Sequence, residues 1–260
     1  MLTFSQIASY FETHLQQHYT RSILREYLQY LILQAIYTSE YGSRLVFLGG
    51  TCLRIAYQSG RFSEDLDFDN RGLDEDDWKR MAEMIAIFLR REWLEVENHT
   101  IFKWAFHCHI KIPHILFQYG FSEHHDEKIL IQIDTVAQWY DYLAIPHTLD
   151  LFGISETILV TPREMLLSQK IRAAYERKRT KGRDFYDIRF LLSWWVKPDY
   201  GYLWEKMHLH NADELRSFMQ EKNAGIDFSQ LARDVEPFLF RAEDVKLVRD
   251  FSDMVAGMRL

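Results

Sequence analysis

The sequence predicts an α/β (α+β) protein in which a mixed sheet with helices is followed by a helical C-terminal part. Short apolar and β-branched runs, separated by turn residues, continue up to Val160, and such runs are typical of strands. After Val160, apolar residues recur at steps of three and four, which is typical of amphipathic helices. We therefore expect one part at residues 1–160 and a helical domain at residues 161–260.

The first part begins with helices and continues with strands. Ile23, Leu24, Tyr27 and Leu28 open a stripe at helical spacing, whereas residues 65–69 alternate between acidic and apolar side chains, as strands do. In chain order we expect two helices within 4–39 that break near Tyr19, a strand at 44–48, and a helix at 51–57 capped by Thr51. A strand at 65–69 and a helix at 75–90 capped by Asp74 follow. We then expect two or three strands within 93–118, of which Trp104 to Ile112 is the clearest, and strands at 129–134 and 158–160.

The second part begins where Thr161 offers a capping hydroxyl and Pro162 suits the first helical position. From there we expect helices at about 163–179, 183–196, 212–222 and 242–258. We interpret Trp194, Trp195 and Trp204 as packing anchors rather than as side chains that stack on a ligand.

The composition excludes several classes of protein. With 260 residues, 47% of them hydrophobic, the chain can bury a sizeable core and does not have the composition of a disordered protein. No apolar run approaches the roughly 18 residues of a membrane span, and Met1 to Gln6 does not resemble a secretory signal. Cys52 and Cys108 are too few for a disulfide framework. We therefore expect a cytoplasmic protein with reduced thiols and no membrane partner.

The charge is unevenly distributed. A net charge of −7 argues against a protein that coats nucleic acid. Segment 163–183, however, carries eight basic residues against two acidic ones, a net +6, so the remainder of the chain carries −13. A local basic face on an acidic protein suits a ligand that carries phosphate.

The predicted strand 65–69 carries the strongest candidate for a metal site. Asp65 and Asp67 lie two residues apart, so their side chains point to one face of the strand, and carboxylates held that close favour a cation between them. Mg²⁺ is bound in this way, by one or two carboxylates together with phosphate oxygens. An acidic pair on a solvated strand edge would have the same sequence, so the pair alone is weak evidence.

The turn Gly49-Gly50-Thr51 strengthens this interpretation. It closes one strand and opens a helix, so backbone amides and a hydroxyl are presented where phosphate oxygens could reach them. A plain strand-to-helix connection would look similar. Asp134, at the end of strand 129–134, is a candidate third carboxylate of a two-metal site, and its alternative role is to cap the next turn.

Three charged residues lie on helical stripes that are otherwise apolar. Lys170 follows Leu166 and Leu167 at helical spacing, and the stripe of the next helix runs back onto Asp184 and Asp187. Buried charges must be paired or must reach into a site. One interpretation is an internal salt bridge that also includes Arg183. The other makes Lys170 a phosphate ligand and Asp184 a catalytic or orienting carboxylate.

The motifs together resemble those of a known family. Residues 48–54 (LGGTCLR) and 61–68 (RFSEDLDF) resemble the first motif of the AbiEii/AbiGii-type nucleotidyltransferase toxins, and residues 170–174 (KIRAA) and 183–188 (RDFYDI) resemble the later lysine and Arg-Asp-x-x-Asp motifs. The resemblance extends from about residue 45 to residue 195. Thr51 stands where serine is more usual, which keeps the hydroxyl.

The resemblance implies a polymerase-β-like nucleotidyltransferase core, Mg²⁺ and a nucleoside triphosphate (NTP). It implies catalytic roles for Asp65, Asp67, Lys170 and Asp184, metal binding by Asp65 and Asp67 with Asp134 added from the expected fold, and nucleotide binding by Gly49, Gly50, Thr51, Arg54, Arg61, Lys170 and Asp187. Whether Asp184 or Asp187 is the essential acid stays open.

Members of that family are typically toxins of bacterial toxin–antitoxin systems tied to phage defence, and some modify tRNA 3′ ends. The resemblance therefore implies an RNA acceptor, in particular tRNA, and an antitoxin partner. Two alternatives remain at this point: a transferase that modifies a protein or a small molecule, and a nucleotide-binding module without catalysis.

Overall fold

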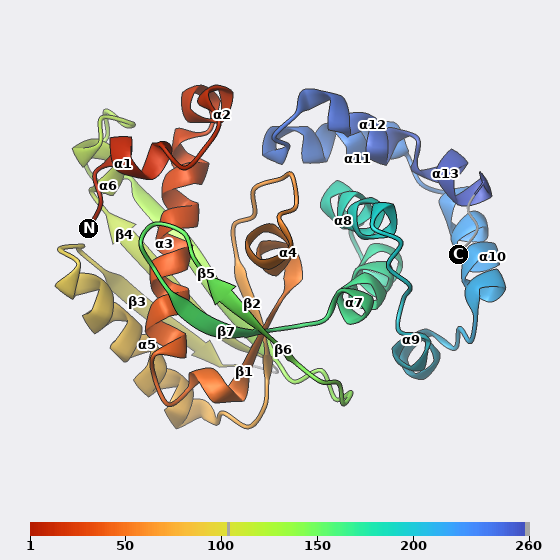
Figure 1. Ribbon diagram of the computed structural model, residues 1–260, viewed down its shortest axis with the longest axis horizontal. Coiled ribbons are helices and arrows are strands. Elements are labelled where there is room, and N and C mark those ends of the chain that lie inside the picture. The colour runs from red at the N-terminus through yellow and green to blue at the C-terminus, as the bar shows by residue number, and fades with distance from the viewer. Residues whose placement is uncertain (103–104, 258–260) are drawn as a thin grey trace. The chain divides into compact units, whose positions relative to one another are not determined.

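The computed structural model describes residues 1–102 and 105–257, which form two compact units (Figure 1). The first unit comprises Met1–Tyr57, Phe62–Trp139 and Ala144–Val160, and the second comprises Gln58–Arg61, Tyr140–Leu143 and Thr161–Leu260. None of the described helices combines the length and the apolar character that a membrane span requires.

The first unit is built on one mixed sheet. Within the described residues its strands have the order β3-β4-β5-β2-β1-β7-β6. The pairs β2–β5 and β1–β7 are parallel, and the other neighbours are antiparallel. The bounds are β1 Leu45–Leu48, β2 Leu66–Asn70, β3 Glu97–Phe102, β4 Phe106–Pro113, β5 Lys128–Val136, β6 Ile145–Leu149 and β7 Glu156–Val160.

The two faces of this sheet differ in polarity. On one face Leu66 and Phe68 of β2 lie beside buried residues of β4 and β5 such as Cys108 and Ile133. Helices α3 (Thr20–Tyr37) and α5 (Glu75–Arg91) pack against each other and against this apolar face, where Trp78 of α5 lies beside a β4 ring, Phe106. The other face carries the polar positions of the same strands, because successive side chains alternate.

Shorter helices complete the first unit. They are α1 (Phe4–Ala8), α2 (Thr13–His18), α4 (Gly49–Tyr57) and α6 (Ile115–Gln118). Helix α4 directly follows β1 and packs against β1 and β2, so it begins at the edge of the strand pair that carries the acidic residues.

The second unit is helical. Its helices are α7 (Arg163–Glu176), α8 (Gly182–Ser193), α9 (Tyr200–Met207), α10 (Ala212–Asn223), α11 (Phe228–Val235), α12 (Val245–Arg249) and α13 (Phe251–Gly257). Phe185 of α8 lies at the centre of its core and makes ring contacts with Tyr175, Phe228 and Phe251. The short segment 58–61 belongs to this unit: the carbonyl of Gly60 accepts a hydrogen bond from the amide of Phe240.

The structure confirms the predicted mixed α/β class and most long elements. The break at Tyr19 is present, Asp74 caps α5, and β5 and β7 lie where strands were expected. The strand predicted from Trp104 is β4, which begins at Phe106; Trp104 itself lies outside the described residues. The prediction missed β6, α6, α9 and α11, and the single helix expected before Tyr19 is two helices, α1 and α2.

Three local predictions were wrong. Helix α4 begins at Gly49, so Thr51 lies inside the helix and does not cap it. The hydroxyl of Thr161 lies 3.1 Å from the hydroxyl of Tyr142, and Pro162 occupies the N-cap of α7 without a side-chain cap. The helix predicted at 242–258 is two helices, α12 and α13, that meet at Asp250, and position 258 lies outside the described residues.

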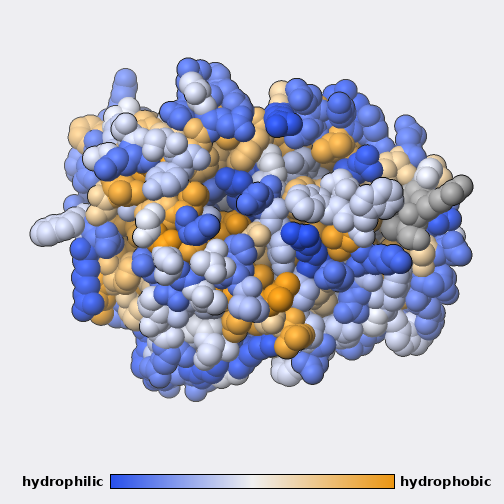
Figure 2. Space-filling view, viewed as in Figure 1, coloured by the Kyte–Doolittle hydropathy of each residue, from blue (hydrophilic) through white to orange (hydrophobic). Residues whose placement is uncertain are grey.

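The tryptophans of the second unit are more exposed than predicted. Trp195 is 88% exposed and Trp194 55%, so neither is a packing anchor, and Trp204 is also exposed, with its ring stacked on His210. On the face drawn in Figure 2, hydrophobic residues appear as small patches among hydrophilic ones.

Candidate active site

The register of the sheet places two aspartates side by side. Strands β2 and β5 are parallel neighbours, and Asp67 is the register partner of Asp134. Neighbouring strands lie about 4.8 Å apart and partnered side chains point to the same face. Leu66 and its partner Ile133 are fully buried on the opposite face, which fixes the two carboxylates on the polar face.

Asp65 stands immediately before β2, two residues from Asp67. Its backbone carbonyl accepts a hydrogen bond from the hydroxyl of Thr51, which is fully buried. The Thr51 hydroxyl therefore joins the first turn of α4 to the start of the acidic strand. The sequence predicted this hydroxyl at the phosphates; in the structure its partner is the protein itself.

Gly49 connects β1 to α4 in a conformation that requires glycine. Its φ of +80° lies in the left-handed region, and a Cβ at this position would collide with the carboxylate of Asp67. Gly50 follows as a buried residue in the first turn of α4. This turn therefore places the N-terminus of α4, a kind of position that attracts anions, next to the acidic strand.

Two residues that the sequence did not single out hold Asp134. Nδ1 of His107 lies 2.8 Å from one carboxylate oxygen, and Nε2 of Gln132 donates to the other at 2.7 Å. His107 is the register partner of Asp134 on β4. The signal in the sequence was the alternation of polar residues with Cys108 and Ile110 along β4, which marks His107 as lying on the polar face.

In the second unit, Lys170 and two aspartates form a buried ion-pair network. Nζ of Lys170 lies 3.0 Å from Oδ1 of Asp184 and 2.8 Å from Oδ2 of Asp187. Arg61 donates two hydrogen bonds to Asp187, at 2.7 and 2.6 Å, and Arg177 donates to Asp184 at 3.1 Å. The three inward charges predicted from the helical stripes are thus brought together.

Two arginines join this network that the sequence did not pair with it. Arg61 contacts Asp187 and Arg177 contacts Asp184. The guanidinium of Arg183, which was considered for the salt bridge, also lies 5.0 Å from the centre of the Phe238 ring. Arg61 could not be placed from the sequence, because it precedes Asp187 by more than a hundred residues.

The network carries a net positive charge. Three cationic groups face two carboxylates, a net +1 if all are ionised. Burial alone would lower the pKa of Lys170, but Asp187 and Asp184 outweigh burial and raise it. Burial alone would raise the pKa of Asp187, but Arg61 and Lys170 outweigh it and lower the pKa. The lysine is therefore a cation at neutral pH, and its side chain is still 12% exposed.

Both arginines predicted to bind the nucleotide have carboxylate partners in the protein. Arg54 donates two hydrogen bonds of 2.9 Å to Glu26 of α3, and Arg61 is paired with Asp187. The predicted residues thus fall into two groups, each within one unit. The first unit carries Gly49, Gly50, Thr51, Arg54, Asp65, Asp67 and Asp134, and the second carries Arg61, Lys170, Asp184 and Asp187.

Solved structures of similar fold are known. A Helicobacter pylori protein provisionally described as a nucleotidyltransferase shares 14% sequence identity with this chain, with a TM-score of 0.54 over 91% of this chain and 95% of its own. The H. pylori protein JHP933 shares 15% identity, with a TM-score of 0.53 over 91% of this chain and 92% of its own. At such identities the similarity shows the fold alone. A search of curated proteins found no match.

The sequence also matches a family profile. The family described as "Nucleotidyl transferase AbiEii toxin, Type IV TA system" matches residues 31–256, which is most of the chain. The match includes the glycine turn, the acidic strand and the lysine network. The chain therefore belongs to the AbiEii toxin family of type IV toxin–antitoxin systems and is a nucleotidyltransferase.

Proposed function

We propose that this nucleotidyltransferase transfers a nucleotide from an NTP to RNA, with tRNA as the first acceptor to test, in a reaction that depends on Mg²⁺. In such a transfer a hydroxyl oxygen of the acceptor bonds to the α-phosphorus of the NTP while the bond to pyrophosphate breaks. The observation that carries the proposal is the pairing of Asp67 with Asp134 beside the Gly49 turn.

The acidic group has the chemistry that Mg²⁺ requires. Asp65, Asp67 and Asp134 offer hard oxygen ligands from one side of two adjacent strands. Two carboxylates in register repel each other, and a cation between them would offset that repulsion. These three residues would hold the ion, which when bound would neutralise charge on the phosphate oxygens. His107 and Gln132 fix the direction of Asp134 through both of its oxygens.

The turn before α4 suits the phosphates of the NTP. We propose that the backbone amides of Gly49, Gly50 and Thr51 face the phosphates, as amides at helix N-termini do. The buried hydroxyl of Thr51 keeps Asp65 at a fixed position relative to that turn. Arg54, held by Glu26, acts in this proposal by anchoring α4 to α3.

Lys170 is the residue of the second unit that we propose as a phosphate ligand. It is charged, partly exposed and held between Asp184 and Asp187, so little freedom is lost when it binds a phosphate oxygen. Asp184 orients Lys170 and, through Arg177, connects it to the basic end of α7. Asp187 and Arg61 form the buried base of this network.

The basic segment supports an RNA acceptor. Beyond the end of α7, Arg177, Lys178, Arg179 and Lys181 are exposed, and a cluster of this kind binds phosphate backbones. The net charge of −7 instead favours a protein or a small molecule, so both are included in the test. We propose that an antitoxin controls the protein, which the family's description as a type IV toxin supports. We also propose that the toxin acts in the cytoplasm and serves phage defence.

The experiment supplies each of the four NTPs, labelled at the α-phosphate, together with Mg²⁺ and total RNA, a protein extract or an aminoglycoside. We expect label in RNA, sensitive to ribonuclease and lost with chelator, and we expect Asp67→Asn and Asp134→Asn to abolish it. Asp213→Asn, an exposed acid on α10, is the control that should retain activity. Label in protein or aminoglycoside alone would overturn the RNA acceptor, and no label with any NTP would contradict the proposed activity.

A further inference from the structure

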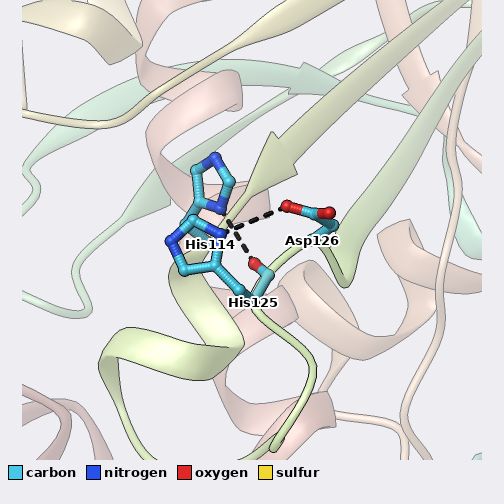
Figure 3. A group of neighbouring side chains, drawn as sticks. All are labelled: His114, His125 and Asp126. Carbon is cyan, nitrogen blue, oxygen red and sulfur yellow. Dashed lines mark hydrogen bonds and ion pairs between the residues drawn. The ribbon is translucent and has the colours of Figure 1, made fainter.

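A group of metal-binding side chains lies at the other end of the β4–β5 pair. His114 directly follows β4, and His125 and Asp126 precede β5 (Figure 3). The strands are antiparallel and their last register pair is Pro113 with Lys128, so these residues lie at one end of the hairpin. One ligand atom from each of the three lies within 4.8 Å of the others. We propose that His114, His125 and Asp126 bind a Zn²⁺ ion.

The backbone conformation of His114 supports the proposed zinc site. Its φ of 63° and ψ of −16° lie in the left-handed region, which non-glycine residues seldom adopt. Its Nδ1 lies 2.8 Å from the carbonyl oxygen of His125, on the side of the ring that faces His125 and Asp126, whereas Nε2 points away from both (Figure 3). Nδ1 is therefore the nitrogen that would bind the ion, in place of its contact with that carbonyl. Histidine ligands of zinc commonly donate their other N–H to a carboxylate, and Nε2 of His114 lies 3.4 Å from a carboxylate oxygen of Glu95.

The spacing of the group is wider than that of an occupied zinc site by roughly 1 Å. Bonds of 2.0–2.2 Å in a tetrahedral site place ligand atoms about 3.3–3.6 Å apart. Nδ1 of His125 already lies 3.2 Å from Oδ1 of Asp126, and the three ligand atoms lie within 4.8 Å of one another. Binding would therefore draw the ligand atoms together by roughly 1 Å, and His125 and Asp126 are exposed enough to move.

The ligand types separate this group from the acidic strand. Imidazole nitrogens with one carboxylate favour Zn²⁺ among the common divalent ions, whereas Mg²⁺ favours oxygen alone. Three protein ligands leave a fourth position for water, and the carboxylate of Glu95 beside Nε2 of His114 would hold the ring in its orientation. The ion would join the residue after β4 to the turn before β5. It would therefore stabilise the connection between two strands of the sheet, independently of the nucleotide chemistry.

The test uses the full chain, stripped of metal, and measures Zn²⁺ binding by calorimetry and by thermal unfolding. An ion that binds only the folded protein raises the unfolding temperature. We expect Zn²⁺ to bind the wild type and raise its unfolding temperature, and we expect His125→Gln and Asp126→Asn to weaken binding about tenfold or more, as loss of zinc-site contacts does. Both side chains are exposed, so both variants should fold.

The matched control is His124→Gln, which changes the neighbouring histidine of the same turn and should bind Zn²⁺ like the wild type. Equal affinity of the wild type, His125→Gln and Asp126→Asn would overturn the site, as would failure of the wild type to bind Zn²⁺. Weakening by His124→Gln equal to that by His125→Gln would also overturn this assignment of ligands. Neither readout depends on transferase activity.

Discussion

Asp67 on β2 and Asp134 on β5 are register partners in adjacent parallel strands. The pairing joins the acidic motif to a residue from a distant part of the chain, on the polar face of a sheet whose other face is apolar core. Gly49 lies against Asp67 from the neighbouring strand β1, where Leu48 is the partner of Asp67. The backbone of three strands thus determines where the carboxylates stand.

The contact of Gly49 with Asp67 predicts a defect specific to the site. Gly49→Ala adds a Cβ that meets the Asp67 carboxylate, in addition to the left-handed strain of φ +80°. Strain of this kind costs about 1–3 kcal/mol. We expect Gly49→Ala to lower stability within this range, measured by urea unfolding, and to lower transferase activity more than the fraction of folded protein explains.

Gly153→Ala is the matched control. Gly153 has a φ of +75° but no atom within 4 Å of an added Cβ, so this variant carries the backbone strain without the collision. It should lose a similar free energy of unfolding and keep its activity. Equal activity of the two alanine variants would contradict a role for Gly49 in placing Asp67.

The hydrogen bond between His107 and Asp134 predicts a change in metal requirement. His107→Phe keeps an aromatic ring on β4 but removes the nitrogen that lies 2.8 Å from the carboxylate. Loss of such an outer contact typically weakens metal binding about 10–100-fold. We expect His107→Phe to need more Mg²⁺ for half-maximal activity, with partial recovery in His107→Asn, whose amide can donate.

His109→Phe is the control for this measurement, because position 109 lies two residues along β4 on the same polar face and pairs with Gln132 rather than Asp134. A Mg²⁺ requirement unchanged by His107→Phe, or changed as much by His109→Phe, would argue that His107 has no positioning role.

The elements that the sequence predicted well have strong local patterns. Helices α3 and α5 have long apolar stripes, and β5 alternates clearly. Strand β6 was missed because it contains Pro146 and little alternation, which an edge strand tolerates. The last predicted helix was too long because its apolar periodicity continues across Asp250, where the backbone breaks.

Candidate site residues could be recognised where they interrupt an apolar pattern. Lys170 and Asp187 were found in this way, since each stands on a buried helical stripe. The contact of Arg61 with Asp187 and the contact of His107 with Asp134 could not be predicted. Both depend on which distant segments of the chain lie side by side, which local sequence does not encode. The resemblance named Arg61 for the nucleotide, and the structure adds its ion pair with Asp187.

The pair of Arg61 with Asp187 predicts a large loss of stability when it is broken. Asp187 is fully buried and holds Arg61 and Lys170. Removing one partner of a buried ion pair costs about 3–5 kcal/mol because the other charge is left unpaired. We expect Asp187→Asn to lower the free energy of unfolding in urea by that amount. Glu176→Gln, which breaks the exposed pair with Arg172, should change it by about 0.5 kcal/mol or less.

The same network predicts how stability depends on pH. The pKa of Asp187 is lowered from 3.8 on folding, so its contribution is present above that value and is lost as pH falls below about 4. The pKa of Lys170 is raised from 10.5, so its contribution is present below that value and is lost as pH rises beyond it. In Asp187→Asn the free energy of unfolding in urea should fall less steeply than in the wild type as pH is lowered from neutral to about 3. An equally steep fall in Asp187→Asn and in the wild type would contradict this assignment.

The left-handed backbone at Trp195 predicts that glycine at this position gives a more stable protein than alanine. It follows α8 with a φ of 58°, its amide donates to Leu192 and the next amide donates to Leu191, the pattern of a helix end that favours glycine. Left-handed backbone costs a non-glycine residue about 1–2 kcal/mol, and a side chain 88% exposed contributes little packing. Trp195→Gly should therefore unfold at higher urea than Trp195→Ala, which keeps the strain. Trp204→Gly, inside α9, should instead destabilise by about 1 kcal/mol. If Trp195→Gly were no more stable than Trp195→Ala, the left-handed conformation at this helix end would not be the source of strain.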